Sequence, residues 1–235
     1  KKLNYDFIEF FAEKNINKKN PIWSNAGIKK YIKEAQKNKL KIYSFCDDYY
    51  IKNYLGNKKT LNYALNIIKR LKLLKIKKYI IPLYGKSFLN KKNKQNAIKN
   101  ISHIGKICIK YKIELLLESN MSPKNFFEIK KKILHKNCFF LFDTGNRVTL
   151  KRNFQKDINN FGKYIKHIHL KDKNKLKKNV IIGKGLVNFN LLFSNLKKIN
   201  YKGSFSIESQ RGYDILKQAG KNYLFFKKLV NKYKL

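Results

Sequence analysis

Short apolar runs alternate with longer amphipathic segments along most of the chain. The apolar runs are rich in Ile, Leu, Phe and Tyr, a composition typical of parallel strands that are buried on both faces. We therefore expect seven strands, at residues 5–10, 41–46, 77–83, 113–118, 138–143, 165–171 and 204–208.

The segments between these runs carry the spacing of an amphipathic helix. Apolar residues recur at i, i+3, i+4 and i+7 over residues 61–68, and similar spacing occurs over 192–199 and 216–230. Ser122 and Pro123 provide a helix N-cap and a first-turn proline directly after the strand that ends at Glu118.

Strand–helix alternation of this kind implies a parallel sheet covered by helices. Seven such units within 235 residues fit an α/β fold of the TIM (β/α)8 type, with the first strand apparently missing from this chain. We expect a single domain over residues 1–235. A doubly wound open sheet is the alternative.

The net charge of +41 raises the question of a nucleic-acid partner. Nearly all basic residues are Lys, however, and they are spread along the chain rather than gathered in one patch. Asn, Ile, Phe and Tyr are also abundant, so a bias toward A/T-rich codons explains the whole pattern. We expect a dispersed basic surface and no specific nucleic-acid partner.

The chain has no apolar segment or cysteine pattern typical of a membrane or secreted protein. No apolar run approaches the roughly 20 residues that a membrane span requires, so no membrane partner is expected. Three cysteines without C-x-x-C spacing favour reduced thiols. These features predict a cytoplasmic protein.

Four of the predicted strands have a metal-ligand residue type at or near their carboxyl ends: Glu118, Asp143, His169 and Glu208. In a parallel barrel these ends converge on one face, where active sites lie. A buried carboxylate is unfavourable unless it is paired, and one divalent cation satisfies three carboxylates and an imidazole together. Oxygen and nitrogen ligands suit Mn²⁺, Mg²⁺, Co²⁺ or Zn²⁺.

Strand alternation distinguishes the two histidines of this region. His167 and His169 share parity, so both side chains project to the same face of their strand. His169 is closer to the carboxyl end and is assigned to the metal. His167 is interpreted as a hydrogen-bonded core histidine.

At these residues the sequence resembles the xylose isomerase-like TIM barrels, specifically the sugar phosphate isomerase/epimerase family. The motifs that carry the resemblance are Glu118, Asp143-Thr-Gly-Asn146, His167-Ile-His169-Leu-Lys-Asp172, Gly183-Lys-Gly-Leu-Val-Asn-Phe189 and Ile207-Glu208-Ser209.

The resemblance implies that Glu118, Asp143, His169 and Glu208 bind one metal ion, with Mn²⁺ expected first. It also implies that Glu118 and Glu208 form the acid/base pair of an isomerase or epimerase. The substrate class that the resemblance implies is a ketose, either a free sugar or a sugar phosphate, that reacts through a cis-enediolate.

Three further residues are candidates for binding the substrate. Lys171 shares parity with His169, and Asn146 occupies a position where some relatives carry a substrate-contacting His. Arg211 follows Glu208 closely and is notable because Arg is scarce in this chain. Gly183-Lys-Gly185 resembles a loop that shapes the mouth of the site, and alone it does not establish phosphate binding. A homodimer is left open.

Two catalytic alternatives share the fold, and a non-catalytic barrel is a third reading. An apurinic endonuclease-like DNA repair nuclease requires a three-metal cluster with several more histidines than the four in this chain. An inosose dehydratase-like lyase starts from the same enediolate and is compatible with the same residues.

Overall fold

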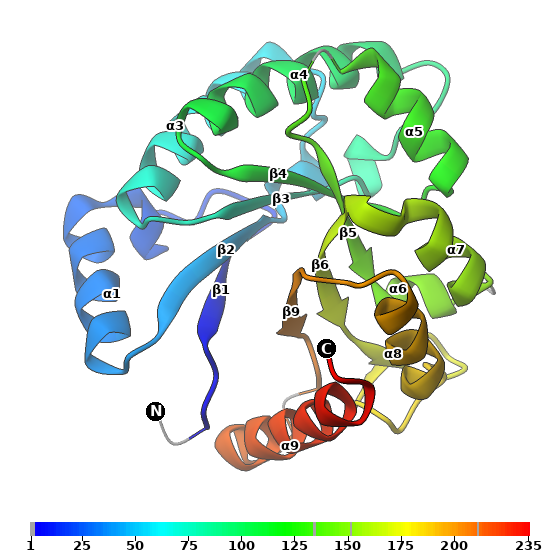
Figure 1. Cartoon of the computed structure of the whole chain (residues 1–235). Coiled ribbons are helices and arrows are strands. Elements are labelled where there is room, and N and C mark those ends of the chain that lie inside the picture. The colour runs from blue at the N-terminus through cyan, green and yellow to red at the C-terminus, as the bar shows by residue number, and fades with distance from the viewer. Residues whose placement is uncertain (1–2, 134, 151, 211) are drawn as a thin grey trace. The chain divides into compact units, whose positions relative to one another are not determined.

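The computed structural model of the chain describes residues 3–133, 135–150, 152–210 and 212–235 (Figure 1). Contacts divide the chain into two compact units. The first consists mainly of Tyr5–Ser119 and Lys124–Phe139, and the second mainly of Phe140–Leu235 with Asn120–Pro123.

The first unit contains four parallel strands that pair in sequence order. They are β1 (Phe7–Ala12), β2 (Lys41–Asp47), β3 (Lys78–Pro82) and β4 (Glu114–Glu118). All residues of β3 are buried, as expected for a parallel strand covered on both faces. The first four predicted strands are therefore confirmed, with ends displaced by at most two residues.

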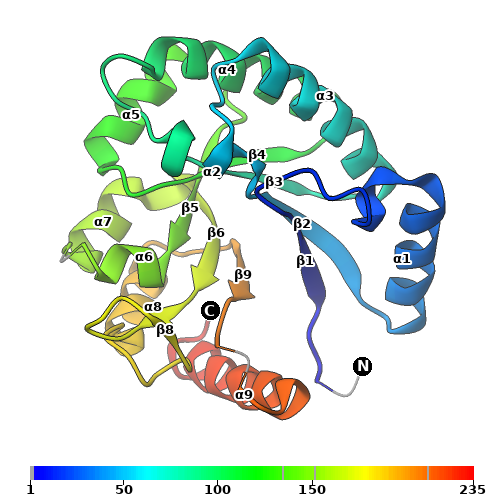
Figure 2. The same ribbon diagram turned by 180° about the vertical axis from the view of Figure 1, so that it is seen from behind.

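Helices lie along one face of this four-stranded sheet (Figures 1 and 2). The helical elements of this part of the chain are η1 (Pro21–Trp23), α1 (Asn25–Lys37), α2 (Tyr49–Lys52), α3 (Lys58–Leu73), η2 (Gly85–Ser87), α4 (Lys94–Lys110) and α5 (Pro123–Lys132). The predicted helix at residues 61–68 is part of α3, but Leu61 and Leu65 are only half-buried. Tyr63 and Ile67 are buried in their place, because the core-facing stripe is rotated by about one residue.

The second unit contains three parallel strands: β5 (Phe139–Asp143), β6 (Ile165–Leu170) and β9 (Ser204–Ile207). They match the last three predicted strands. A short antiparallel hairpin follows β6 and consists of β7 (Asp172–Lys173) and β8 (Asn179–Val180). This hairpin was not predicted.

The helical elements of the second unit are α6 (Thr144–Val148), α7 (Phe154–Phe161), η3 (Gly162–Tyr164), α8 (Phe189–Lys198) and α9 (Ile215–Tyr233). Stacked aromatic rings hold helices to strands, with ring centroids 3.9 Å apart for Phe140 and Phe161 and 5.6 Å apart for Phe193 and Phe205.

The apolar face expected for α9 is only partly buried. Phe226 packs against Phe205, with ring centroids 5.2 Å apart, but Leu216 is 70% exposed. Gln218 and Asn222 occupy buried positions instead and bond to each other at 2.9 Å. This hydrogen bond pairs the Gln218 side-chain N–H with the Asn222 side-chain oxygen, which reduces the cost of polar residues on the covered side.

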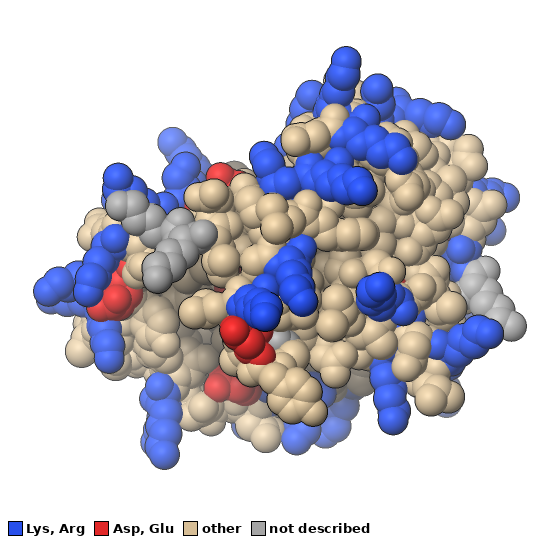
Figure 3. All heavy atoms as spheres, turned by 90° about the horizontal axis from the view of Figure 1, so that it is seen from below, with Lys and Arg blue, Asp and Glu red and all other residues tan. Residues whose placement is uncertain are grey.

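One face of the molecule agrees with the expectation of dispersed charge. Lys and Arg side chains are scattered over the face shown in Figure 3. Within the described part of the chain, no helix has both the length and the apolar character needed to cross a membrane.

A buried carboxylate lies on the helix-covered side of the first unit. Asp47, at the end of β2, is fully buried and accepts hydrogen bonds from the hydroxyls of Tyr79 at 2.6 Å and Tyr63 at 3.0 Å. The hydroxyl of Tyr50 lies 3.0 Å from that of Tyr79. Burial raises the pKa of Asp47 to about 7, although the two tyrosine hydrogen bonds act in the opposite direction.

This raised pKa makes the stability of the first unit depend on pH. The folded carboxyl group retains its proton to about pH 7, whereas its ordinary pKa is 3.8, so its stabilising contribution is lost as pH rises through this window. In Asp47→Asn no such proton is released. We expect the free energy of unfolding of the wild type, relative to that of the variant, to fall by on the order of 3 kcal/mol between pH 4 and pH 7.5.

Urea unfolding of both proteins across this pH range measures the difference. Parallel pH profiles for wild type and Asp47→Asn would contradict the assignment of the raised pKa to Asp47.

Candidate functional site

The ends of three neighbouring strands bring together three of the predicted site residues. Asp143 is the last residue of β5 and pairs in register with His169 on β6. His169 in turn pairs with Ser206 on β9. Glu208 follows β9 directly, where its backbone N–H donates to the carbonyl of Leu170 at 3.0 Å.

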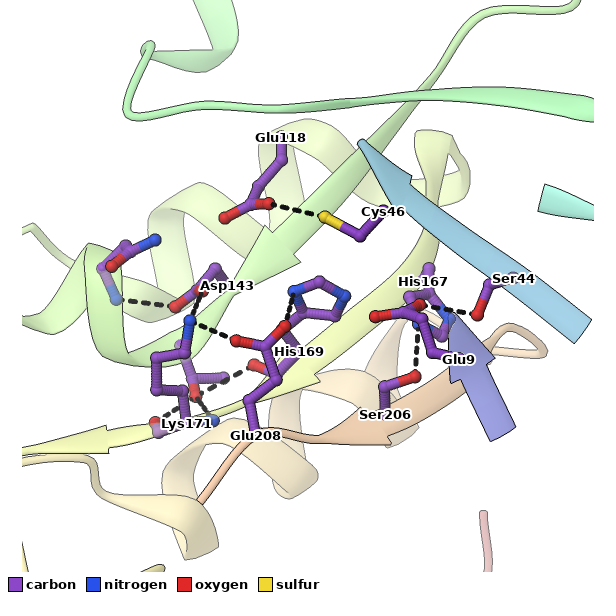
Figure 4. A network of polar contacts seen from close by, with 12 residues as sticks. Glu9, Ser44, Cys46, Glu118, Asp143, His167, His169, Lys171, Ser206 and Glu208 are labelled. Atoms are coloured by element: carbon purple, nitrogen blue, oxygen red, sulfur yellow. Dashed lines mark hydrogen bonds and ion pairs between the residues drawn. The ribbon is translucent and has the colours of Figure 1, made fainter. Parts of the chain in front are cut away.

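The side chains of these residues form a charged cluster (Figure 4). His169 Nδ1 lies 2.9 Å from Glu208 Oε1, and Lys171 Nζ lies 3.0 Å from Asp143 Oδ2. Lys171 also forms an ion pair with Glu208. Asp143 and His169 are buried, whereas 35% of the Glu208 side chain is exposed. One ammonium group therefore bridges the carboxylates of two strands.

The charge state of Glu208 is set by its neighbours. Burial alone would raise the pKa of Glu208, but His169 and Lys171 outweigh this effect and lower the pKa to about 2. Glu208 is therefore a carboxylate at neutral pH.

The Asp143-Thr-Gly-Asn146 motif connects the ends of β5 and β6. Asp143 is the N-cap of α6 and accepts from the backbone N–H of Asn146 at 2.7 Å. The Thr144 hydroxyl donates to the carbonyl of Lys171 at 2.6 Å and accepts from its N–H at 2.9 Å. A Cβ at Gly145 would lie only 2.8 Å from Lys171 Cγ, so glycine permits this close approach.

The two glycines of Gly183-Lys-Gly185 donate hydrogen bonds to a carboxylate of the protein itself. Asp172 is fully buried, and its carboxylate accepts from the backbone N–H groups of Gly183 at 3.0 Å, Gly185 at 2.8 Å and Val187 at 3.0 Å. These amides are already bound by Asp172. The two glycine N–H groups therefore hold the hairpin to Asp172, and the place of this loop at the mouth of the site stays a prediction.

The first unit contributes a buried carboxylate at a strand end. Glu118 is the last residue of β4, pairs with Pro82 and is 5% exposed. Cys46 Sγ lies 4.0 Å from Glu118 Oε2, a weak thiol–carboxylate contact (Figure 4). In the same unit, Glu9 accepts a hydrogen bond of 2.5 Å from Ser44.

The remaining predicted residues have different outcomes. His167 is fully buried and lies 2.6 Å from Ser204 Oγ and 2.9 Å from Ser206 Oγ, which confirms its interpretation as a hydrogen-bonded core histidine. Asn146 Oδ1 accepts from Lys173 Nζ at 3.0 Å. Arg211 lies outside the described residues.

Two residues of this region were missed by sequence reasoning. Lys173 could not be distinguished among so many lysines. Arg147 could have been singled out, because the scarcity of Arg in the chain marks it as much as Arg211. Arg147 is 1% exposed, pairs with Asp157 and lies over the rings of Phe142 and Phe161 at 5.1 and 5.2 Å. It holds α6, the helix that follows Asp143, to α7.

Removal of Arg147 would leave the Asp157 carboxylate buried without this ion pair. We expect Arg147→Met to lower the free energy of unfolding by about 3–5 kcal/mol, measured by urea denaturation. The double variant Arg147→Met/Asp157→Asn serves as the control and should regain part of the loss. A loss below about 1 kcal/mol in the single variant would argue against a structural role for this pair.

Comparison with known proteins identifies the family. The sequence matches the family model described as Xylose isomerase-like TIM barrel over residues 1–229. No curated protein matches the chain.

Solved structures share the fold at low sequence identity. A D-tagatose 3-epimerase-like protein is 22% identical with a TM-score of 0.80, and the match covers 98% of this chain and 90% of that one. A D-psicose 3-epimerase in the presence of D-fructose is 18% identical with a TM-score of 0.79, covering 97% and 90%. A xylose isomerase-like TIM barrel protein from Mycobacterium smegmatis in complex with magnesium is 16% identical with a TM-score of 0.77, covering 99% and 86%.

These matches confirm the predicted α/β fold of the TIM type and exclude the doubly wound alternative. The predictions of one domain over residues 1–235 and of a further N-terminal strand stay predictions. The chain belongs to the Xylose isomerase-like TIM barrel family.

Proposed function

We propose that this protein is a metal-dependent isomerase or epimerase that acts on a ketose or a ketose phosphate. The observation that carries the proposal is the cluster of Asp143, His169 and Glu208 at the ends of three paired strands. Similar solved structures that include a D-tagatose 3-epimerase-like protein and a D-psicose 3-epimerase support the substrate class.

The donor atoms fit a divalent metal ion. Two carboxylates and an imidazole offer oxygen and nitrogen ligands, and the Lys171 ammonium lies against both carboxylates, so positive charge is favourable there. Glu118 is proposed as the fourth ligand, because strand ends face the active site in TIM-type barrels. Mn²⁺ is proposed first. The magnesium complex of a similar structure supports Mg²⁺, and Co²⁺ and Zn²⁺ also accept this set of ligand atoms.

A bound metal would polarise the substrate carbonyl and stabilise the negative charge that develops on its oxygen. In the proposed mechanism one of the two glutamates, Glu118 or Glu208, removes the proton on the carbon next to the carbonyl, and a glutamate returns it. Return to the opposite face of the same carbon yields an epimer. Return to the former carbonyl carbon yields an aldose–ketose isomer.

Three residues are proposed to orient the substrate. The Lys171 ammonium and the Asn146 backbone N–H both donate to Asp143, so the Lys171 ammonium and the Asn146 side-chain amide are proposed to donate to substrate oxygens. Arg211 is proposed as a third contact on sequence grounds alone.

The acid/base assignment is tested by removing each carboxylate. We expect Glu118→Gln or Glu208→Gln to reduce proton exchange by at least roughly 100-fold, because an amide cannot transfer the proton. The measurement is NMR of deuterium incorporation into a panel of ketoses and ketose phosphates in D₂O with Mn²⁺. Glu128→Gln on the exposed side of α5 is the matched control and should retain activity.

Retained exchange in both variants would exclude the glutamate pair. The same spectra distinguish the lyase alternative, since dehydration gives a different product. Cleavage of abasic DNA with three metal ions per chain would instead favour the nuclease.

Metal dependence is a separate prediction. Treatment with EDTA should abolish proton exchange, and added Mn²⁺ or Co²⁺ should restore it, because the carbonyl is no longer polarised without the ion. Elemental analysis verifies removal of the metal. Full activity of a protein shown to be metal-free would contradict the proposed mechanism.

A further inference from the structure

Lys173 differs from the other lysines of the β7–β8 hairpin. Lys175, Lys177 and Lys178 are exposed, whereas Lys173 is half-buried. The Lys173 ammonium donates to Asn146 Oδ1 at 3.0 Å, so its side chain turns toward α6 rather than into solvent. The hairpin is drawn in yellow in Figure 2, where its second strand is labelled β8.

The backbone of Lys173 is held on several sides. Its N–H donates to Asp172 Oδ1 at 2.9 Å, its carbonyl accepts from Leu186 at 2.9 Å, and it pairs with Asn179 on β8. Asp172 is itself fixed by the buried amide contacts described above. The position of the Lys173 Cα is therefore set before any ligand binds, which reduces the entropy lost on binding.

Asn146 connects Lys173 to the candidate metal ligand Asp143. Asn146 donates its backbone N–H to Asp143 Oδ1 at 2.7 Å and accepts the Lys173 ammonium with its side chain. The charge of Lys171 is balanced by Asp143 and Glu208. The Lys173 ammonium contacts a neutral amide oxygen, and in the described ranges of the chain it forms no ion pair with a carboxylate.

A half-buried ammonium that contacts only a neutral oxygen gains a charge-assisted hydrogen bond when an anion approaches. Lysine is well suited to a phosphate or carboxylate oxygen, since it provides a compact positive charge with three donors. Because Asn146 intervenes between Lys173 and Asp143, we assign the Lys173 ammonium to a substrate group other than the reacting carbons.

We propose that Lys173 and Asn146 form a subsite for an anionic group carried by the substrate, either a phosphate or a carboxylate. This inference rests on the proposed function and deepens it, because it assigns the substrate to the anionic ketoses. Lys173 acts in binding and specificity and has no part in proton transfer.

The test compares ligands that share one carbon chain and differ at its end. D-fructose, D-fructose 6-phosphate and D-fructuronate are neutral, phosphorylated and carboxylated, respectively. Their binding to the full chain is measured by calorimetry at about 0.15 M salt, which screens the surface lysines. We expect at least one anionic ketose to bind roughly tenfold or more tightly than D-fructose. The anion that is preferred identifies the group.

Variants assign the preference to the subsite. Lys173→Gln should weaken the binding of the preferred anionic ketose by roughly tenfold and leave D-fructose binding unchanged. Lys175→Gln removes the same charge from the same hairpin and should leave all three affinities unchanged. Lys173→Arg should retain part of the preference.

Equal losses in Lys173→Gln and Lys175→Gln would overturn the proposal, since general surface charge would then be the cause. Failure of both anionic ketoses to bind more tightly than D-fructose would also overturn it. These measurements require no turnover. A selective loss in Lys173→Gln without proton exchange on any ketose would support the subsite while the proposed function failed.

Discussion

The hydrogen-bonded register of β6 between β5 and β9 is the constraint on which the candidate site depends. A shift of one residue would turn His169 to the opposite face of the sheet, because side chains alternate along a strand. The Thr144 hydroxyl bonds to both the N–H and the carbonyl of Lys171, just beyond the end of β6. This contact fixes the register at the place where the polar side chains gather, so the distances within the cluster follow from backbone geometry.

Three carboxylates of this chain show three ways to stabilise an acidic group away from solvent. Asp47 accepts hydrogen bonds from two neutral tyrosine hydroxyls. These lower its pKa less than burial raises it, so the pKa rises to about 7. Asp172 receives backbone amides and serves as a structural anchor. Glu208 lies beside an imidazole and an ammonium, and its pKa falls to about 2. Among the three, Glu208 has cationic neighbours together with an exposed edge, as expected of a group that interacts with small charged ligands.

Much of the fold could be predicted from the sequence because buried parallel strands leave a strong local signal. The ends of the apolar runs at Glu118 and Asp143 coincide with the ends of β4 and β5. The β7–β8 hairpin escaped prediction because it has only two residues in each strand and is specified by Asp172, whose partners lie up to 15 residues away. Local patterns do not reveal such contacts.

The residue types of the candidate ligands could be predicted from the sequence, but the contacts that neighbouring side chains make with them could not. Glu and Asp at strand ends are visible in the sequence, and strand parity with His169 singles out Lys171, whereas Lys173 is one among many lysines. Only the three-dimensional structure shows that Lys171 binds two carboxylates and that Lys173 binds Asn146. The buried polar pair on α9 escaped prediction for the same reason, since the hydrogen bond between Gln218 and Asn222 is visible only in the structure.

The anchoring of the hairpin by Asp172 has a consequence for how this protein can diverge. The contacts to Asp172 use backbone amides, which every residue except proline supplies, although positive φ at Gly183 and close packing at Gly185 favour glycine at those two positions. The tip, with Leu176 at 75% exposure, takes no part in this anchor. Tip residues can therefore be exchanged or lengthened while the strand ends stay unchanged. Such changes at the tip leave Lys173 in place, because Lys173 belongs to the anchored strand β7.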